Sequence, residues 1–364
     1  MSLKRQRTLP NWGISKRRTA CSAEVMGKPH LPHDLIFEIL SYLPVLSLLR
    51  FRTVCTLWRD TIRDPIFIDK HMTPQASLAI AYRSGLEAPN PDRGIAEESC
   101  FIWCFLHGLQ LEECKKTHAY SIRNPSTKQV LTLPFPKKIV LIMTMCFIST
   151  SKVYKLVCLY LDEFTHDRLG CQVLTIGTDS SWRTIDSPVT WYDRHYDKLK
   201  GYIIIKGVLY VIKNSKHGDS KLICVEMEKE QFVQVSIPRY LFSDTDNVWP
   251  LCWNRAMLSF VNIVKQRLRV WILEDYTKMR WDRNEIDIPL TFLKDFPDFG
   301  NDDLYIRVMT DDILLFIVKA EHAIFYSINS ASVKHKASAP PGKKFFIINN
   351  RSTLVSLAGM QPFA

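Results

Sequence analysis

A repeat of about fifty residues constrains the fold of this chain more than any other feature of its sequence. Five times, a short run with the composition of a strand leads into a proline, and these prolines lie 50 to 54 residues apart: Pro134, Pro188, Pro238, Pro289 and Pro340. Periods of this length with several short strands each are typical of β-propeller blades. Proline fits just past an outer blade strand, because no neighbouring strand needs its missing N–H there.

The residues between these prolines have the composition that blades require. Short runs rich in valine, isoleucine, tyrosine, phenylalanine and tryptophan favour strands, and turn-forming residues separate them, as at Asn124–Thr127. We therefore predict an all-β, propeller-like domain over residues 72–364, with roughly five to seven blades. The last blade is expected to use Phe345–Ile348 and Leu354–Leu357, with Leu78–Tyr82 as its closing strand.

The stretch before this region, residues 31–71, follows a different pattern. Its apolar residues recur at every third or fourth position, which is the spacing of amphipathic helices. Pro32 suits a first helical turn, whereas Pro44 and Pro65 interrupt the pattern, because proline disfavours helical geometry in the residue before it. We expect three short helices. The fold class is therefore α+β, with a small helical unit followed by an all-β domain.

This helical unit is too small to be self-sufficient. A unit of about forty residues seldom buries enough surface to fold alone. It also has apolar residues on more than one helix face, among them Ile36, Phe37 and Tyr42. Such a surplus needs a second surface to cover it. Periodicity alone leaves open whether that surface belongs to the rest of this chain or to another protein.

The order and spacing of residues in the helical unit resemble the F-box. The matching residues are Leu31-Pro32, Asp34-Leu35, Glu38-Ile39-Leu40, Leu43-Pro44, Ser47-Leu48-Leu49, Val54-Cys55, Trp58-Arg59 and Asp64-Pro65. In that family the unit docks on a Skp-type adaptor, which joins it to a cullin and a RING protein in a ubiquitin ligase. Two places depart from the pattern: a basic residue is common at Leu46, and lysine often occurs at Thr56-Leu57.

The resemblance implies an adaptor-binding surface made by the apolar residues of the unit and their neighbours. These residues are Leu31, Pro32, Leu35, Ile39, Leu40, Leu43, Pro44, Leu48, Leu49, Val54, Cys55, Trp58 and Ile62.

A second resemblance covers about residues 119–290. The runs YSIRNPSTKQVLTLP, CQVLTIGTDSSWRTID and LICVEMEKEQFVQVSIP resemble, in content and in order, the F-box-associated, kelch-like domain of plant F-box proteins. Val211 and Glu226 depart from that pattern, since tryptophan and aspartate are usual there. This resemblance implies a propeller that recruits a target protein for ubiquitination, and it does not identify the target.

One loop has the composition of a protein interface. The run after Pro188 is rich in tryptophan, tyrosine and arginine, which dominate interface hot spots, although a base-stacking surface would use the same types. We expect this loop either to contact the target or to be partly buried. Its candidate residues are Trp191, Tyr192, Arg194, His195 and Tyr196.

The first thirty residues lack apolar periodicity and are expected to form a disordered basic tail. Their charges supply six of the net +11 of the chain. Two basic clusters resemble a bipartite nuclear-import signal: Lys4, Arg5, Lys16, Arg17 and Arg18. The alternative is a solvated tail with non-specific affinity for nucleic acid or acidic surfaces. The chain lacks a signal-peptide core and any membrane-length apolar run, so we expect it in the nucleus, the cytoplasm or both.

Other classes of function find little support in the sequence. The chain lacks GxSxG, GxGxxG and P-loop motifs. Its ten cysteines are expected to be reduced thiols. Large apolar residues separate Cys100, Cys104, His107, Cys114 and His118, which favours core and loop positions over a zinc site. We therefore expect no catalytic residue, metal, cofactor or membrane contact, and no nucleic-acid partner.

The predicted function is a non-catalytic substrate receptor of a Skp–cullin–F-box ubiquitin ligase. Two alternatives remain open. One is a propeller scaffold whose helices are covered from within the chain, and the other is a nucleic-acid-associated protein that uses its basic tail.

Overall fold

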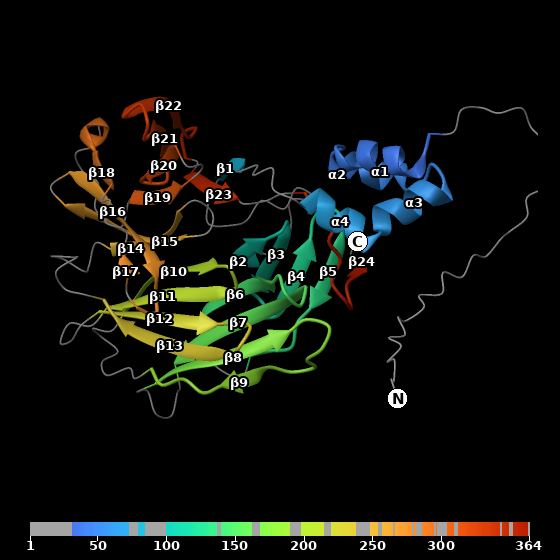
Figure 1. Cartoon of the computed structure of the whole chain (residues 1–364), viewed down its shortest axis with the longest axis horizontal. Coiled ribbons are helices and arrows are strands. Elements are labelled where there is room, and N and C mark those ends of the chain that lie inside the picture. Colours follow the sequence, from blue (N-terminus) through green and yellow to red (C-terminus); the bar gives the residue numbers. More distant parts are fainter. Residues whose placement is uncertain are drawn as a thin grey trace, which may run out of the picture.

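The computed structural model shows a group of four helices beside a ring of β-sheets (Figure 1). It describes residues 31–72, 79–83, 100–136, 140–161, 168–189, 198–214, 220–237, 248–253, 257–264, 266–278, 280–281, 286–294, 296, 304–308, 312–342, 344–348 and 352–362. The helices are α1 (His33–Ser41), α2 (Val45–Phe51), α3 (Thr56–Arg63) and α4 (Pro65–Met72). Within the described parts of the chain, no helix is both long and apolar enough to span a membrane.

The prediction of three helices is wrong by one, since the structure has a fourth. Asp64 does end α3, but Pro65 then begins α4, because the first turn of a helix does not use the N–H that proline lacks. The backbone of Asp64 is extended, and its Oδ1 accepts a hydrogen bond from the Ile66 N–H at 2.7 Å. One aspartate therefore terminates one helix and caps the next.

Apart from the first strand and the last but one, which pair with each other, the described strands form five antiparallel blades. Blade 1 contains β2 (Cys100–Leu106), β3 (Leu109–Cys114), β4 (Tyr120–Asn124), β5 (Gln129–Thr132) and the added β24 (Gln361–Pro362). Blade 2 contains β6 (Val140–Ile148), β7 (Val153–Leu161), β8 (Leu169–Thr175) and β9 (Arg183–Ile185). Blade 3 contains β10 (Lys198–Ile205), β11 (Val208–Asn214), β12 (Lys221–Glu226) and β13 (Gln231–Ser236).

In blade 4 the outer position is shared. Its strands are β14 (Val248–Trp253), β15 (Met257–Val264), β16 (Arg267–Asp275), β17 (Arg280–Trp281) and β18 (Ile286–Pro289), and both β17 and β18 pair with β16. The short 3-10 helix η2 (Thr291–Leu293) follows. Blade 5 contains β19 (Leu304–Val308), β20 (Ile313–Val318), β21 (His322–Ser327) and β22 (Ser332–Ser338).

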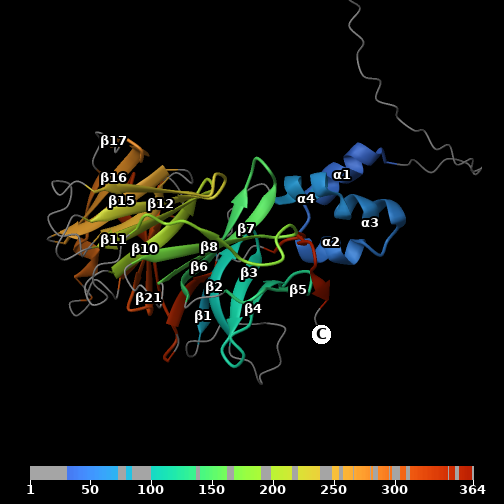
Figure 2. The ribbon, with the colours of Figure 1, turned by 90° about the horizontal axis from the view of Figure 1, so that it is seen from below.

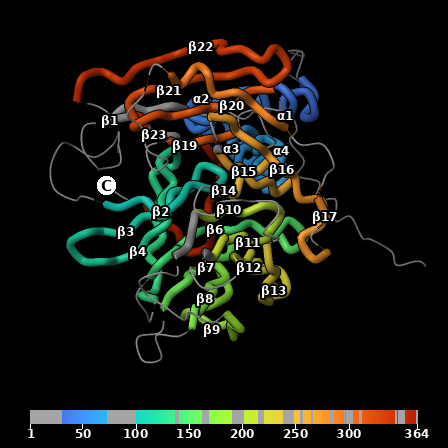
Figure 3. The backbone as a smooth tube through the Cα atoms, turned by 90° about the vertical axis from the view of Figure 1, so that its left-hand side faces the viewer, coloured from blue at the N-terminus to red at the C-terminus, as the bar shows by residue number. Residues whose placement is uncertain are grey.

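The five blades surround a common centre (Figure 3). Their first strands, β2, β6, β10, β14 and β19, lie innermost, and contacts join β2 to β6, β10 to β14 and β14 to β19. The prolines of the repeat mark the outer strands as predicted: Pro134, Pro188 and Pro340 follow β5, β9 and β22, and Pro289 ends β18. Pro238 lies outside the described residues. The predicted propeller is therefore confirmed, with five blades.

Segments from before the first blade and after the last blade meet. β1 (Ala79–Arg83) pairs with β23 (Lys344–Ile348). The two predicted segments therefore do pair, but in a separate two-stranded sheet and not in the predicted last blade. The predicted strand at Leu354–Leu357 is wrong. Its side chains enter two different cores, and its backbone meets a side chain instead of a strand: Asn124 Nδ2 donates to the carbonyls of Thr353 at 3.2 Å and Val355 at 2.7 Å.

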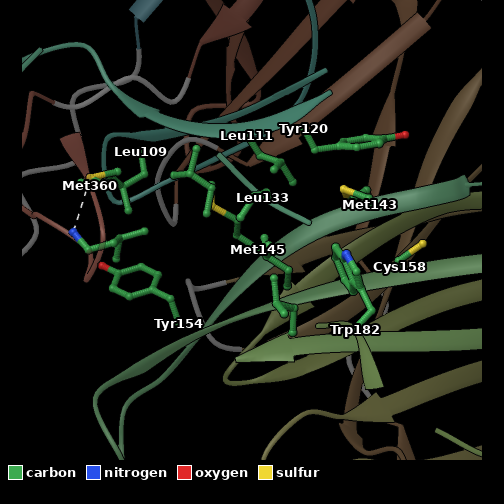
Figure 4. Packing of buried hydrophobic residues seen from close by; sticks show 14 of the residues in the cluster. Leu109, Leu111, Tyr120, Leu133, Met143, Met145, Tyr154, Cys158, Trp182 and Met360 are labelled. Atoms are coloured by element: carbon green, nitrogen blue, oxygen red, sulfur yellow. Dashed lines mark hydrogen bonds between the residues drawn. The ribbon is translucent and has the colours of Figure 1, made fainter. Parts of the chain in front are cut away.

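Residues 352–362, which we term the strap, join the helices to the propeller. Leu354 is buried in the core of the helical unit, among α1, α2, α3 and α4. Val355 and Met360 are buried in the core shared by blades 1 and 2, where Met360 lies near Leu109 and Tyr154 (Figure 4). Beyond Met360 the strap pairs with β5 as β24. The strap thus belongs to both units at once.

Helix α4 makes the second connection between the two units (Figure 2). Ile68 and Met72 pack against the core of blades 1 and 2. Asp69 Oδ2 forms an ion pair at 2.6 Å with Nζ of Lys152, which lies in the turn between β6 and β7. The helices therefore lie at the end of the propeller where the inner strand β6 ends and the chain turns into β7.

Candidate functional site

The helical unit carries most of the exposed apolar surface of the molecule. Among the described residues, twelve large apolar side chains are exposed, and eight of them lie in this unit. The eight are Leu31, Leu35, Ile39, Tyr42, Leu46, Val54, Leu57 and Ile66. A concentration of this kind marks an interaction surface, because scattered single exposures are the norm on a soluble protein.

The geometry of α1 explains why its outer face is apolar. Leu35, Ile39 and Tyr42 are four and three residues apart, so they share one face of the helix. Ile39 is 52% exposed, whereas its neighbour Leu40 is 1% exposed and lies in the core. Both sides of α1 are therefore apolar, and only the inner one is covered, by the other helices and by Leu354 of the strap. The unit is completed from within the chain, yet it keeps an uncovered face.

Polar contacts hold α4 against α1 behind this face. Lys70 Nζ of α4 pairs with Glu38 of α1 and lies 5.3 Å from the centre of the Phe37 ring. His71 Nε2 lies 2.8 Å from the Leu43 carbonyl oxygen. The exposed face is thus presented on a fixed arrangement of helices.

The structure divides the thirteen predicted adaptor residues into three groups. Exposed are Leu31, Pro32, Leu35, Ile39, Pro44, Val54 and Cys55. Half-buried are Leu43, Leu49 and Trp58. Buried are Leu40, Leu48 and Ile62. The three buried side chains need a corrected role, because they lie in the core of the unit and can support a partner surface only by holding the helices together. Adaptor contact by the exposed members stays a prediction.

Four exposed apolar side chains were missing from the predicted set: Tyr42, Leu46, Leu57 and Ile66. The set followed the family pattern, from which Leu46 and Leu57 depart. Helical spacing contained a usable signal for Tyr42, which follows Ile39 by three residues. Ile66 gave no such signal, because its helix was not predicted.

Two other predicted groups cannot be placed. The loop candidates Trp191, Tyr192, Arg194, His195 and Tyr196 lie outside the described residues, as do the basic tail residues Lys4, Arg5, Lys16, Arg17 and Arg18. Both groups stay predictions.

The cysteine- and histidine-rich segment near β2 has structural contacts. Cys104 Sγ accepts a hydrogen bond from the Met145 N–H at 3.3 Å, and burial raises the pKa of its thiol to about 11. His107 Nδ1 lies 2.9 Å from the Tyr154 hydroxyl. Within the described part of the chain, no group of three or more histidine, cysteine, aspartate or glutamate side chains has a metal-binding arrangement.

Comparison with protein families agrees with this division of the molecule. Residues 29–70 match the family described as "F-box domain". Residues 88–331, more than half of the chain, match the family described as "F-box associated beta propeller domain". The chain belongs to the F-box proteins with an associated β-propeller. Helices α1 to α4 are accordingly its F-box region.

Similar proteins of this F-box family occur in Arabidopsis thaliana. F-box protein DOR is 26% identical over 375 residues, which cover 92% of this chain and 89% of that protein. The F-box protein At1g32420 is 28% identical over 292 residues, which cover 72% of this chain and 92% of that protein. The similarity therefore extends over both the helical unit and the propeller.

Proposed function

We propose that this F-box protein is the substrate receptor of a Skp–cullin–F-box ubiquitin ligase. Its F-box binds a Skp-type adaptor, which connects it to a cullin and a RING protein, and its propeller holds a target protein. The observation that carries the proposal is the apolar outer face of the F-box around Leu35, Ile39 and Tyr42, which no described part of the chain covers.

The energetics of burial fit such a partner. Covering one leucine or isoleucine side chain stabilises a complex by about 1.5–3 kcal/mol before association costs are subtracted. Leu35, Ile39 and Leu46 are all exposed, so together they offer enough to hold an adaptor of matching apolar surface. The receptor performs no bond chemistry itself. It accelerates ubiquitin transfer by tethering, which replaces a bimolecular encounter with a high effective concentration.

Co-expression with a Skp-type adaptor, followed by size-exclusion chromatography, tests the proposal. The wild-type chain should elute as a one-to-one complex. Ile39→Asp places a charge on an exposed position, so it should abolish the complex without changing the melting temperature. Phe135→Asp is the matched control, because Phe135 is also an exposed apolar residue but lies between β5 and β6. A soluble wild-type chain that ignores the adaptor would overturn the proposal.

We further propose that the protein enters the nucleus through its basic tail. The support is the pair of clusters Lys4-Arg5 and Lys16–Arg18. A fluorescent fusion of the full chain should accumulate in nuclei, and Lys16→Ala with Arg17→Ala and Arg18→Ala should return it to the cytoplasm. An unchanged distribution of the triple variant would remove this part of the proposal.

A further inference from the structure

Three of the four exposed apolar side chains outside the F-box occupy equivalent positions in different blades. Phe101, Leu141 and Tyr305 are each the second residue of an inner strand, in β2, β6 and β19. Trp249, half-buried, is the second residue of the inner strand β14. Each blade is an antiparallel meander, so its fourth strand ends at the same end of the propeller at which its inner strand began. The next inner strand then begins at that end too, and all inner strands therefore start at the same end of the central channel. These four residues therefore form a ring at its mouth, which we term the rim.

Below the rim, a hydrogen bond joins the inner strands of two blades that are not neighbours. Within β2, the ring of the rim residue Phe101 lies 5.0 Å from that of Trp103 and nearly perpendicular to it. The hydroxyl of Tyr202, from the inner strand β10, donates to the Trp103 carbonyl of β2 at 3.4 Å. Blades 1 and 3 are not neighbours in the ring, so this bond crosses the channel. Burial raises the pKa of Tyr202 to about 12, with smaller contributions from the nearby Cys104 and, last, Tyr305.

Three inner strands, β2, β6 and β10, contain β-bulges in the part of the strand that carries these residues. The pairing of β2 with β3 skips Trp103, that of β6 with β7 skips Leu141, and that of β10 with β11 skips Gly201. Bulges re-aim side chains and are frequent beside functional sites. Gly201 has φ +64°, and a Cβ there would lie 3.4 Å from Pro250 of β14. That distance is an ordinary van der Waals contact, so glycine is favoured at this bulge by its positive φ and not by the closeness of β14.

A cation lies beneath the apolar rim. Arg307 follows Tyr305 by two residues, so both lie on the same side of β19, and Arg307 is half-buried. It lies close enough to Cys252 of β14 to oppose the rise that burial causes in the pKa of that thiol. No ion pair joins Arg307 to any other described residue. A half-buried guanidinium that pairs with no carboxylate of the described residues is suited to an incoming carboxylate, which it can bind through two parallel hydrogen bonds.

The rim faces away from the F-box. Helix α4 contacts the turn between β6 and β7 through Lys152, at the opposite end of the inner strand from Leu141. When the propeller is viewed along its centre, the F-box helices lie behind the blades (Figure 3). A ligand on the rim would therefore not compete with an adaptor on the F-box.

We propose that the rim is the target-recognition site of the propeller, and that its ligand is a short protein segment in which a large apolar side chain lies beside a carboxylate. Phe101, Leu141, Trp249 and Tyr305 receive the apolar side chain, and Arg307 binds the carboxylate. Aromatic residues and arginine are the residue types that dominate binding energy in protein interfaces. The identity of the ligand as a ligase target rests on the proposed function, whereas the binding itself does not.

A library of displayed random peptides, selected on the full-length chain, tests this assignment. The enriched peptides should share an aromatic or aliphatic residue next to aspartate or glutamate. Tyr305→Ser and Phe101→Ser should each weaken the binding of an enriched peptide at least tenfold. Phe135→Ser is the matched control and should leave it unchanged. These positions are about half exposed, at 54% for Tyr305 and 47% for Phe101, so the variants should keep their melting temperatures.

The role of Arg307 is tested with a second change in the peptide. Replacing the peptide's carboxylate by an amide should weaken binding to the wild type about tenfold and should make no difference to Arg307→Met, because the two changes remove the same contact. Selection without an acidic–apolar motif, or binding that survives both serine variants, would overturn the assignment. Peptide binding by a chain that ignores the adaptor would support the rim while removing the proposed function.

Discussion

At the scale of single residues, one carboxylate ties two neighbouring blades together. Glu230 lies between β12 and β13 of blade 3 and pairs with residues of blade 2. It accepts hydrogen bonds from both Nη atoms of Arg183, at 2.6 and 2.7 Å, and from Lys155 Nζ at 2.7 Å. The bonds from Arg183, assisted by Lys155, outweigh the opposing effect of burial and lower the pKa of Glu230 to about 2.

This shift predicts how stability depends on pH. The pKa of Glu230 in the folded protein lies below its ordinary 4.5, so the ionised carboxylate stabilises the fold above pH 4.5. That contribution is lost as the pH falls from about 4.5 toward 2. Glu230→Gln should reduce the free energy of unfolding by about 2 kcal/mol at pH 7, and the difference from the wild type should shrink to zero in this window.

Urea unfolding at a series of pH values measures the effect. Glu274→Gln serves as a control, because the ion pair of Glu274 with Arg280 is largely exposed and such pairs contribute about 0–1 kcal/mol. A stability difference for Glu230→Gln that stays constant from pH 7 to pH 2 would contradict the assignment of the charge.

At the scale of elements, the sequence was a good guide wherever a pattern was local and repeated. The proline-ended runs predicted the outer strands, because proline is tolerated at or just past them, as Pro134, Pro188, Pro289 and Pro340 show. The spacing of apolar residues could not predict which side of each helix is buried. Helix α1 is apolar on both sides, so spacing alone does not show that Leu40 is buried and Ile39 exposed. Helix α4 was missed because Pro65 was interpreted only as a stop and not also as a start.

Substitutions on the buried side of α1 should reduce stability, whereas substitutions on its exposed side should reduce adaptor binding. Leu40→Ala opens a cavity in a small core, so it should lower the free energy of unfolding of the F-box by about 2–5 kcal/mol. Ile39→Ala should leave that stability within about 0.5 kcal/mol but weaken adaptor binding about tenfold. Thermal unfolding and a titration with the adaptor give the two readouts. Equal loss of stability in both variants would refute the described orientation of α1.

At the scale of the whole molecule, the F-box and the propeller share a core through the strap. Leu354 lies about three hundred residues from α1 in sequence, yet it is buried among the F-box helices. The spacing of apolar residues within ten or twenty positions gives no information about a contact between residues so far apart in sequence. The run at Leu354–Leu357 was therefore predicted as a strand from its composition alone.

The strap should control the local stability of the F-box. Leu354→Asp puts a charge into the F-box core, so the amides of α1 to α4 should exchange hydrogen at least tenfold faster, while those of blade 3 should be unchanged. Ser352→Asp is the matched control, because Ser352 is exposed on the same segment. Hydrogen exchange followed by mass spectrometry measures both regions. Uniformly faster exchange throughout the chain would contradict a local role.

The strap also sets an order of events during synthesis. A ribosome makes the F-box helices first and residue 354 only after all five blades have been translated. Until then the emerging F-box lacks the side chain that completes its core, and α4 lacks the finished blades against which it packs. Chains that stop early would carry an F-box of reduced stability. If the chain is the receptor proposed above, competence for adaptor binding would therefore mature only when the propeller is finished, and the ligase would receive only receptors whose target-binding domain is already folded.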